Sequence, residues 1–76
     1  MFSKKLLIYR VINNITLPLA CAPATETISP NIGDLIIIEK RNVWVQDWNN
    51  EEGNFSLVHC NPEFITINQE FFEEIS

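Results

Sequence analysis

Three short runs of β-branched and aromatic residues constrain the fold of this chain more than any other feature. They span residues 35–38, 43–48 and 55–60. The second run alternates its side chains between two faces, which is the period of a β-strand. The runs are separated by residues 40–42 and 49–53, which are mostly polar and typical of tight turns and hairpin loops. The sequence therefore predicts three consecutive antiparallel strands.

The N-terminal part predicts one more strand and then a long connection. A strand is expected over residues 4–12, where residues 6–12 are apolar on both faces apart from Arg10, which is typical of a strand that is covered on both sides. Residues 15–19 are expected to continue this strand after a bend. Three of the four prolines lie in residues 18–33, and proline cannot donate to a sheet ladder, so this segment is expected to be a loop.

The C-terminal part predicts a turn, a short strand and a helical turn. A turn is expected at residues 61–63 because they contain a proline, and residues 64–67 are expected to be extended. Residues 69–75 are expected to form a short helix that places two phenylalanines and an isoleucine on one face. Together these elements predict an all-β fold with about five short antiparallel strands, a short C-terminal helical turn and a single domain over residues 1–76.

The segment of residues 33–67 resembles an SH3-like barrel. Gly33 and Asp34 lead from a long loop into the second strand, Trp44 stands near the start of the third, and Gly53 ends a hairpin loop. The resemblance implies a small barrel whose last strand follows a turn that contains Pro62. Because many unrelated proteins share such barrels, a function does not follow from the fold.

The resemblance also implies a place for a peptide groove. In SH3 domains the groove consists of a tryptophan, an aromatic strip from the first strand and loop, and a proline after the fourth strand. Trp44 and Pro62 match these positions, and Tyr9 is the one residue available for the strip. The acidic loop that contacts an arginine of the ligand is represented here by Glu26 alone.

Composition restricts the classes of partner. The chain has 76 residues, 46% of them hydrophobic, and a net charge of −5 with only five lysines and arginines. This apolar content excludes a disordered chain, and the charge predicts that the protein binds no nucleic acid. An acidic protein is expected to associate more readily with a basic protein surface.

The sequence predicts a cytoplasmic protein. It has no run of about twenty apolar residues that could span a membrane. Lys4 and Lys5 precede a short apolar stretch, but Arg10, Asn13 and Asn14 interrupt it, so a secretion signal is not expected. The many isoleucines and asparagines are typical of an AT-rich genome, such as that of a bacterium or a virus.

The residues with reactive or metal-binding side chains favour neither a catalytic nor a metal site. Cys21, His59 and Cys60 are the only cluster of this kind, and zinc usually needs four ligands at regular spacing. Adjacent residues on a strand point to opposite faces, so His59 and Cys60 are not expected to share a ligand. We expect a buried Cys60 beside a surface His59, two free thiols, no cofactor and no enzymatic activity.

The best candidates for a binding surface are the two tryptophans. If Val43 and Val45 face the core, Trp44 and Trp48 lie on the opposite face. There they form either an interaction platform or a cover for the edge of a small core. Ile37, in the preceding strand, is expected in the core. The predicted partner-binding residues are Trp44, Trp48, Tyr9, Pro62 and, at the hairpin tip, Glu51 and Glu52.

Three classes of function fit these features. The first is a small interaction module, or an accessory or inhibitory subunit, that docks on a larger protein through an aromatic face and an acidic surface. The second is a structural component of a multi-subunit complex or a viral particle. The third is a small metal-binding or thiol-dependent protein. The missing catalytic and metal-binding patterns favour the first class over the third.

Overall fold

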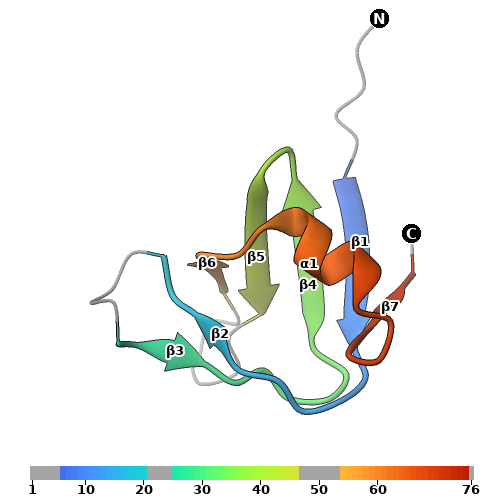
Figure 1. The fold of residues 1–76 in the computed structure, drawn as a ribbon, viewed down its shortest axis with the longest axis horizontal. Helices are drawn as coiled ribbons and strands as arrows, with labels where there is room; N and C mark the ends of the chain where they lie inside the picture. The colour runs from blue at the N-terminus through green and yellow to red at the C-terminus, as the bar shows by residue number, and fades with distance from the viewer. Residues whose placement is uncertain (1–5, 21–24, 47–53, 76) are drawn as a thin grey trace, which may run out of the picture.

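A five-stranded antiparallel sheet dominates the computed structural model (Figure 1), which describes residues 6–20, 25–46 and 54–75. The strand order is β6-β5-β4-β1-β7, and a separate pair is formed by β2 and β3. The strands are β1 (Leu6–Val11), β2 (Leu17–Pro18), β3 (Thr27–Ile28), β4 (Leu35–Glu39), β5 (Asn42–Gln46), β6 (Phe55–Val58) and β7 (Phe72–Glu74). One short helix, α1 (Pro62–Ile67), lies between β6 and β7.

The centre of the sheet is the predicted series of three antiparallel strands. Strand β4 turns into β5 through two residues, and Lys40 at this turn has a left-handed φ of 55°. The register pairs Ile37 with Trp44 and Trp44 with Leu57. Both pairings are antiparallel, which confirms the prediction of three consecutive antiparallel strands.

The long connection between β1 and β4 returns along the edge of β6. Within it, β2 pairs with β3, so residues 17–18 do not continue the first strand as predicted. Leu19 forms a bridge with Val58, and the amide of His59 donates to the carbonyl oxygen of Pro18 at 2.8 Å. The connection therefore occupies backbone groups at the C-terminal end of β6, on the side away from β5.

The entry into β4 depends on Gly33 and Asp34. Gly33 has a φ of 103°, which favours glycine because other residues are strained there. Asp34 is buried, and its Oδ2 accepts from the amide of Asn31 at 2.8 Å. These two residues close the turn that ends the long connection.

The C-terminal segment corrects two predictions. Residues 64–67 belong to α1 rather than to a strand, and residues 72–74 form β7 rather than part of a helix. Asn61 caps the helix, since its Oδ1 accepts from the amide of Glu63 at 2.9 Å, and Pro62 suits the first helical position. The end of the chain is extended because it pairs with β1, where Glu73 lies opposite Arg10.

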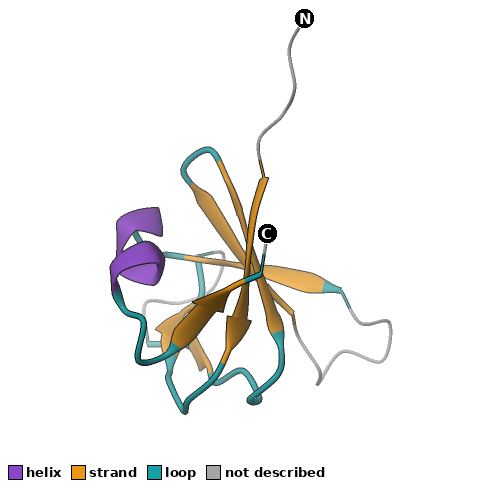
Figure 2. Cartoon of the chain, turned by 90° about the vertical axis from the view of Figure 1, so that its right-hand side faces the viewer, coloured by secondary structure: helices purple, strands orange, loops and turns teal. Residues whose placement is uncertain are grey.

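The core lies between one face of the sheet and α1, which Figure 2 shows on that side. Ile65 of α1 is fully buried, as are Val43 and Val45 of the sheet. The buried apolar residues are Tyr9, Val11, Leu17, Ile28, Ile36, Ile38, Val43, Val45, Val58, Ile65 and Phe72. Ile37 is not among them, because its neighbours on β4 occupy the core face and alternation directs Ile37 to the other side.

The predicted all-β class, with about five antiparallel strands and one short helix, is confirmed. Strands β6 and β7 are the two ends of the sheet order and do not pair with each other, so the sheet is not closed into a barrel. No helix in the described ranges is long and apolar enough to span a membrane.

Candidate functional site

A row of large apolar side chains crosses the sheet on the face opposite the core. We call Ile8, Ile37, Trp44 and Leu57 the outer row. They come from β1, β4, β5 and β6, and the register places each opposite the next. Each side chain in the row is half-buried. Four neighbouring strands thus present one continuous apolar strip that includes an indole ring.

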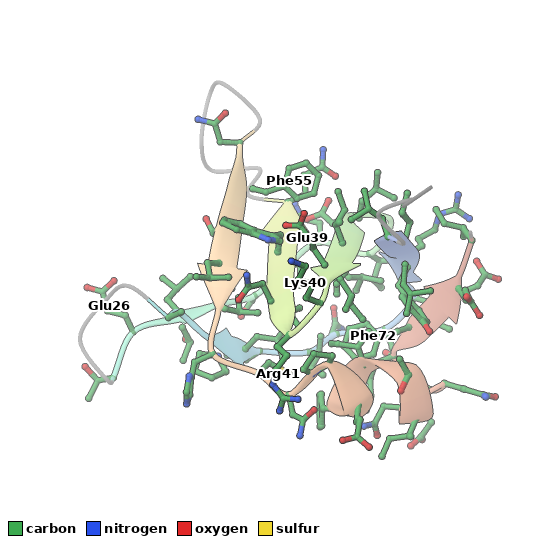
Figure 3. The ribbon with its side chains drawn as sticks, turned by 90° about the horizontal axis from the view of Figure 1, so that it is seen from above. Glu26, Glu39, Lys40, Arg41, Phe55 and Phe72 are labelled. Atoms are coloured by element: carbon green, nitrogen blue, oxygen red, sulfur yellow. The ribbon has the colours of Figure 1, made fainter. Side chains whose placement is uncertain are left out.

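Apolar and charged side chains surround the outer row. Alternation along the strands places Leu35 and Phe55 on the same face, one step from the row. Figure 3 shows Phe55 and Glu39 on the side of the sheet away from α1 and Phe72. At the border with β7, the exposed Arg10 and Glu73 form an ion pair of 3.3 Å. The strip therefore has a polar rim, which is typical of protein interfaces.

A surface pocket of about 450 Å³ has Leu57, a member of the outer row, among its lining residues. It lies between the turn after β4, the end of β6 and the start of α1. Arg41, His59, Cys60 and Pro62 line it together with Leu57. The pocket therefore combines apolar surface with basic side chains, and Arg41 lies on the side of the sheet where α1 is (Figure 3).

The structure places two of the predicted binding residues in separate features that share one residue. Trp44 is in the outer row and Pro62 lines the pocket, and Leu57 belongs to both features. Tyr9 lies apart from them, because its side chain is 6% exposed and faces the core. The predicted contacts Trp48, Glu51 and Glu52 lie outside the described residues.

Sequence reasoning missed three members of the outer row, Ile8, Ile37 and Leu57. Each lies in a run where apolar residues occupy both faces, so periodicity does not distinguish an outer side chain from a core side chain. The signal that identifies them is the pairing with Trp44. Once the strands are aligned, all three fall in its cross-strand row.

His59 and Cys60 have different environments, as their adjacency predicts. His59 is exposed, whereas Cys60 is half-buried and packs against the core. Cys60 is a free thiol, and burial raises its pKa. Cys21 lies outside the described residues. Within the described ranges, no group of three or more His, Cys, Asp or Glu side chains is placed to hold a metal ion.

The raised pKa of Cys60 predicts slow alkylation. A raised pKa leaves less thiolate at any given pH, and the thiolate is the nucleophile. In a Cys21→Ser variant, iodoacetamide at pH 8 should modify the folded protein more slowly than the urea-unfolded chain. The two alkylation rates should become more similar as the pH increases above the ordinary pKa of a thiol. Equal rates at pH 8, measured by mass spectrometry, would contradict the assigned burial.

No family model, curated protein sequence or solved structure matches this chain.

Proposed function

We propose that this protein is a small interaction module, or an accessory subunit, that docks on a larger protein through the outer row. The observation that carries the proposal is the register that aligns Ile8, Ile37, Trp44 and Leu57 on the face away from the core. Tryptophan is enriched at the centres of protein interfaces, and contiguous apolar patches on small proteins usually mark interaction sites. The proposal assigns the protein binding rather than catalysis.

The pocket beside Leu57 extends the proposed interface. Arg41 and His59 supply hydrogen-bond donors there, while Pro62 and Leu57 supply apolar surface. The proposed interface therefore has an aromatic centre and, at one end, a pocket with both apolar and hydrogen-bonding side chains. This composition fits a partner that presents both apolar and polar side chains. The net charge of −5 favours a partner whose surrounding surface is basic.

The proposal includes the SH3-like resemblance. Three features support it: a long connection before β4, a meander of β4, β5 and β6, and a segment containing Pro62 that leads to a last strand paired with β1. In SH3 domains a tryptophan and a proline help to form the peptide groove. Here Trp44 pairs with Leu57, and Leu57 and Pro62 line the same pocket, which supports a related position for the proposed interface.

A Trp44→Ala substitution tests the proposal. We expect it to raise the Kd for the partner at least tenfold, because interface tryptophans commonly contribute about 2 kcal/mol or more. The free energy of unfolding should fall by less than the roughly 3 to 5 kcal/mol typical of a fully buried aromatic residue. The partner is first captured from a native lysate of the cells that make the protein, then purified and titrated by calorimetry.

The matched control is Ile67→Ala. Ile67 is the most exposed large apolar residue in the described ranges, at 73%, but it lies on α1, away from the outer row. Its removal should leave the Kd within about twofold, since isolated surface residues contribute little. Equal losses of affinity in the two variants, or a Trp44→Ala protein that unfolds while Ile67→Ala stays folded, would refute the assigned interface. Light scattering on the free protein distinguishes a separate partner from a second copy of this chain.

A further inference from the structure

A second pocket, of about 330 Å³, lies on the core side of the sheet near its β7 edge. Tyr9 of β1, Phe72 and Glu74 of β7, and Thr66 and Gln69 at the end of α1 all contribute to its lining. It shares no lining residue with the pocket beside the outer row. The function proposed above makes no use of it.

Tyr9 places an unpartnered hydroxyl in this pocket. The side chain is only 6% exposed, and its hydroxyl makes no hydrogen bond to any described residue. No fully enclosed polar side-chain atom in the described ranges lacks a partner, so this oxygen reaches solvent, and Tyr9 is one of the residues that line the pocket. A hydroxyl that reaches solvent in a pocket exchanges its hydrogen bond with water for one with a ligand when a suitable donor binds there.

Glu74 lies directly opposite Tyr9 in the β1–β7 register. Its side chain is on the same face, and the Tyr9 pKa is raised by burial and by the Glu74 carboxylate. Glu73, which also contributes to the lining, is paired with Arg10, whereas Glu74 has no ion-pair partner among the described residues. The pocket thus combines a free hydroxyl, a free carboxylate and aromatic side chains.

A hydroxyl, a carboxylate and aromatic rings in one pocket favour a cationic ligand. An ammonium or guanidinium group donates hydrogen bonds to both the hydroxyl oxygen and the carboxylate, and it is attracted to nearby aromatic rings. A carboxylate ligand would be repelled by Glu74, and an apolar ligand would leave the hydroxyl unsatisfied. Figure 3 shows Phe72 between β7 and α1, where it forms part of the apolar floor. The volume is sufficient for one long cationic side chain.

The adjoining edge of the sheet provides a place for the backbone of such a ligand. Hydrogen bonds from Ile12 to Phe71 and from Ile75 to Ile8 set the β1–β7 ladder. Alternation in an antiparallel ladder then directs the amide and carbonyl groups of Glu74 away from β1. Figure 1 shows no described segment beyond β7 on that side. An extended peptide can therefore add to β7 beside the pocket.

We propose that the Tyr9–Glu74 pocket binds the cationic end of a lysine or arginine side chain, carried by an extended segment of a protein partner that pairs with β7. The net charge of −5 attracts such a segment. The pocket and the outer row are separate proposed contacts. An experiment can therefore refute one of them without refuting the other.

A short peptide tests the proposal. The probe is an acetylated and amidated peptide, Thr-Val-Lys-Val-Thr, and the matched probe carries norleucine in place of lysine. The protein contains one tyrosine, so the ring signals of Tyr9 are unambiguous in an NMR titration. The lysine peptide should produce saturable shifts of the Tyr9 ring and the Glu74 amide, with a Kd at least fivefold lower than that of the norleucine peptide.

Two variants assign the effect to Glu74. Glu74→Gln should raise the Kd of the lysine peptide by about five- to tenfold, because a partly solvated charged hydrogen bond is lost. Glu70→Gln removes the same charge from an exposed position that does not line the pocket, and it should change the Kd less than twofold. Trp44→Ala should bind the peptide normally. Absence of saturable shifts at Tyr9, equal binding of the two peptides, or equal effects of the two glutamine variants would overturn the proposal.

Discussion

Replacement of Phe72 by alanine is expected to lower the free energy of unfolding by about 3 to 5 kcal/mol. Phe72 is 2% exposed and is the largest fully buried side chain in the described ranges. Removal of a buried phenylalanine costs about 3 to 5 kcal/mol. A domain of this size has a total stability of about 4 to 11 kcal/mol. The substitution therefore removes a large part of the free energy of unfolding, which urea denaturation followed by circular dichroism measures.

Phe64→Ala is the control for this prediction. Phe64 makes an edge-to-face contact with Phe72, at 6.2 Å between ring centroids, but it is 38% exposed. It should therefore cost clearly less stability than Phe72→Ala. Ile75→Ala should also have a small effect, because Ile75 is 40% exposed beyond the end of β7. Similar losses at Phe72 and Ile75 would instead support the helix that the sequence predicts at residues 69–75.

Ile36→Ala should lower the free energy of unfolding by about 2 to 5 kcal/mol, the range observed for fully buried isoleucines. Ile36 has no exposed surface and lies opposite Val45, also fully buried, in the centre of the sheet. Thermal denaturation and urea titration both measure the loss. A decrease below about 1 kcal/mol would show that the inner face of β4 is not tightly packed.

The neighbouring Ile37→Ala is the matched comparison. It removes the same atoms from the same strand, but from the half-buried outer row. Its effect on stability should therefore be clearly smaller than that of Ile36→Ala, and part of its effect should appear in partner binding. If Ile37→Ala lost more stability than Ile36→Ala, Ile37 rather than Ile36 would face the core. That result would refute the assigned outer row.

The sequence was most informative where its side chains alternate clearly. Val43 and Val45 alternate with a tryptophan and a glutamine, so their core position could be predicted, and both are fully buried. Residues 35–38 are all apolar and carry no such signal, so Ile37 was assigned to the wrong face. Periodicity within one strand cannot distinguish the faces when both are apolar.

The C-terminal predictions failed for a different reason. Asn61, Pro62 and Glu63 form a helix start, in which asparagine caps and proline occupies the first helical position, but the same residues are also typical of turns. The spacing of Phe71, Phe72 and Ile75 is helical, yet the segment is extended. Pairing with β1 overrides this local pattern, and no local pattern reveals a partner more than sixty residues away.

The candidate site was accessible to prediction only in part. Trp44 and Pro62 could be selected because of their residue types and the resemblance to a known fold. The pocket at Tyr9 could not, because it depends on the register that places Glu74 opposite the hydroxyl. Registers between distant strands are set by the whole fold rather than by either strand alone.

The long connection that lies along β6 also limits how copies of the protein can associate. A sheet with two free edges can add copies at both ends and grow into a fibre, which is the usual hazard of exposed strands. Here the bridge of Leu19 to Val58 blocks one side, and the hairpin partner β3 is only two residues long. Among the described strands, β7 is thus the longer open edge, because the connection covers the C-terminal end of β6. Two copies that met there would complete each other and leave no good template for a third, so self-association through the sheet should stop at a dimer.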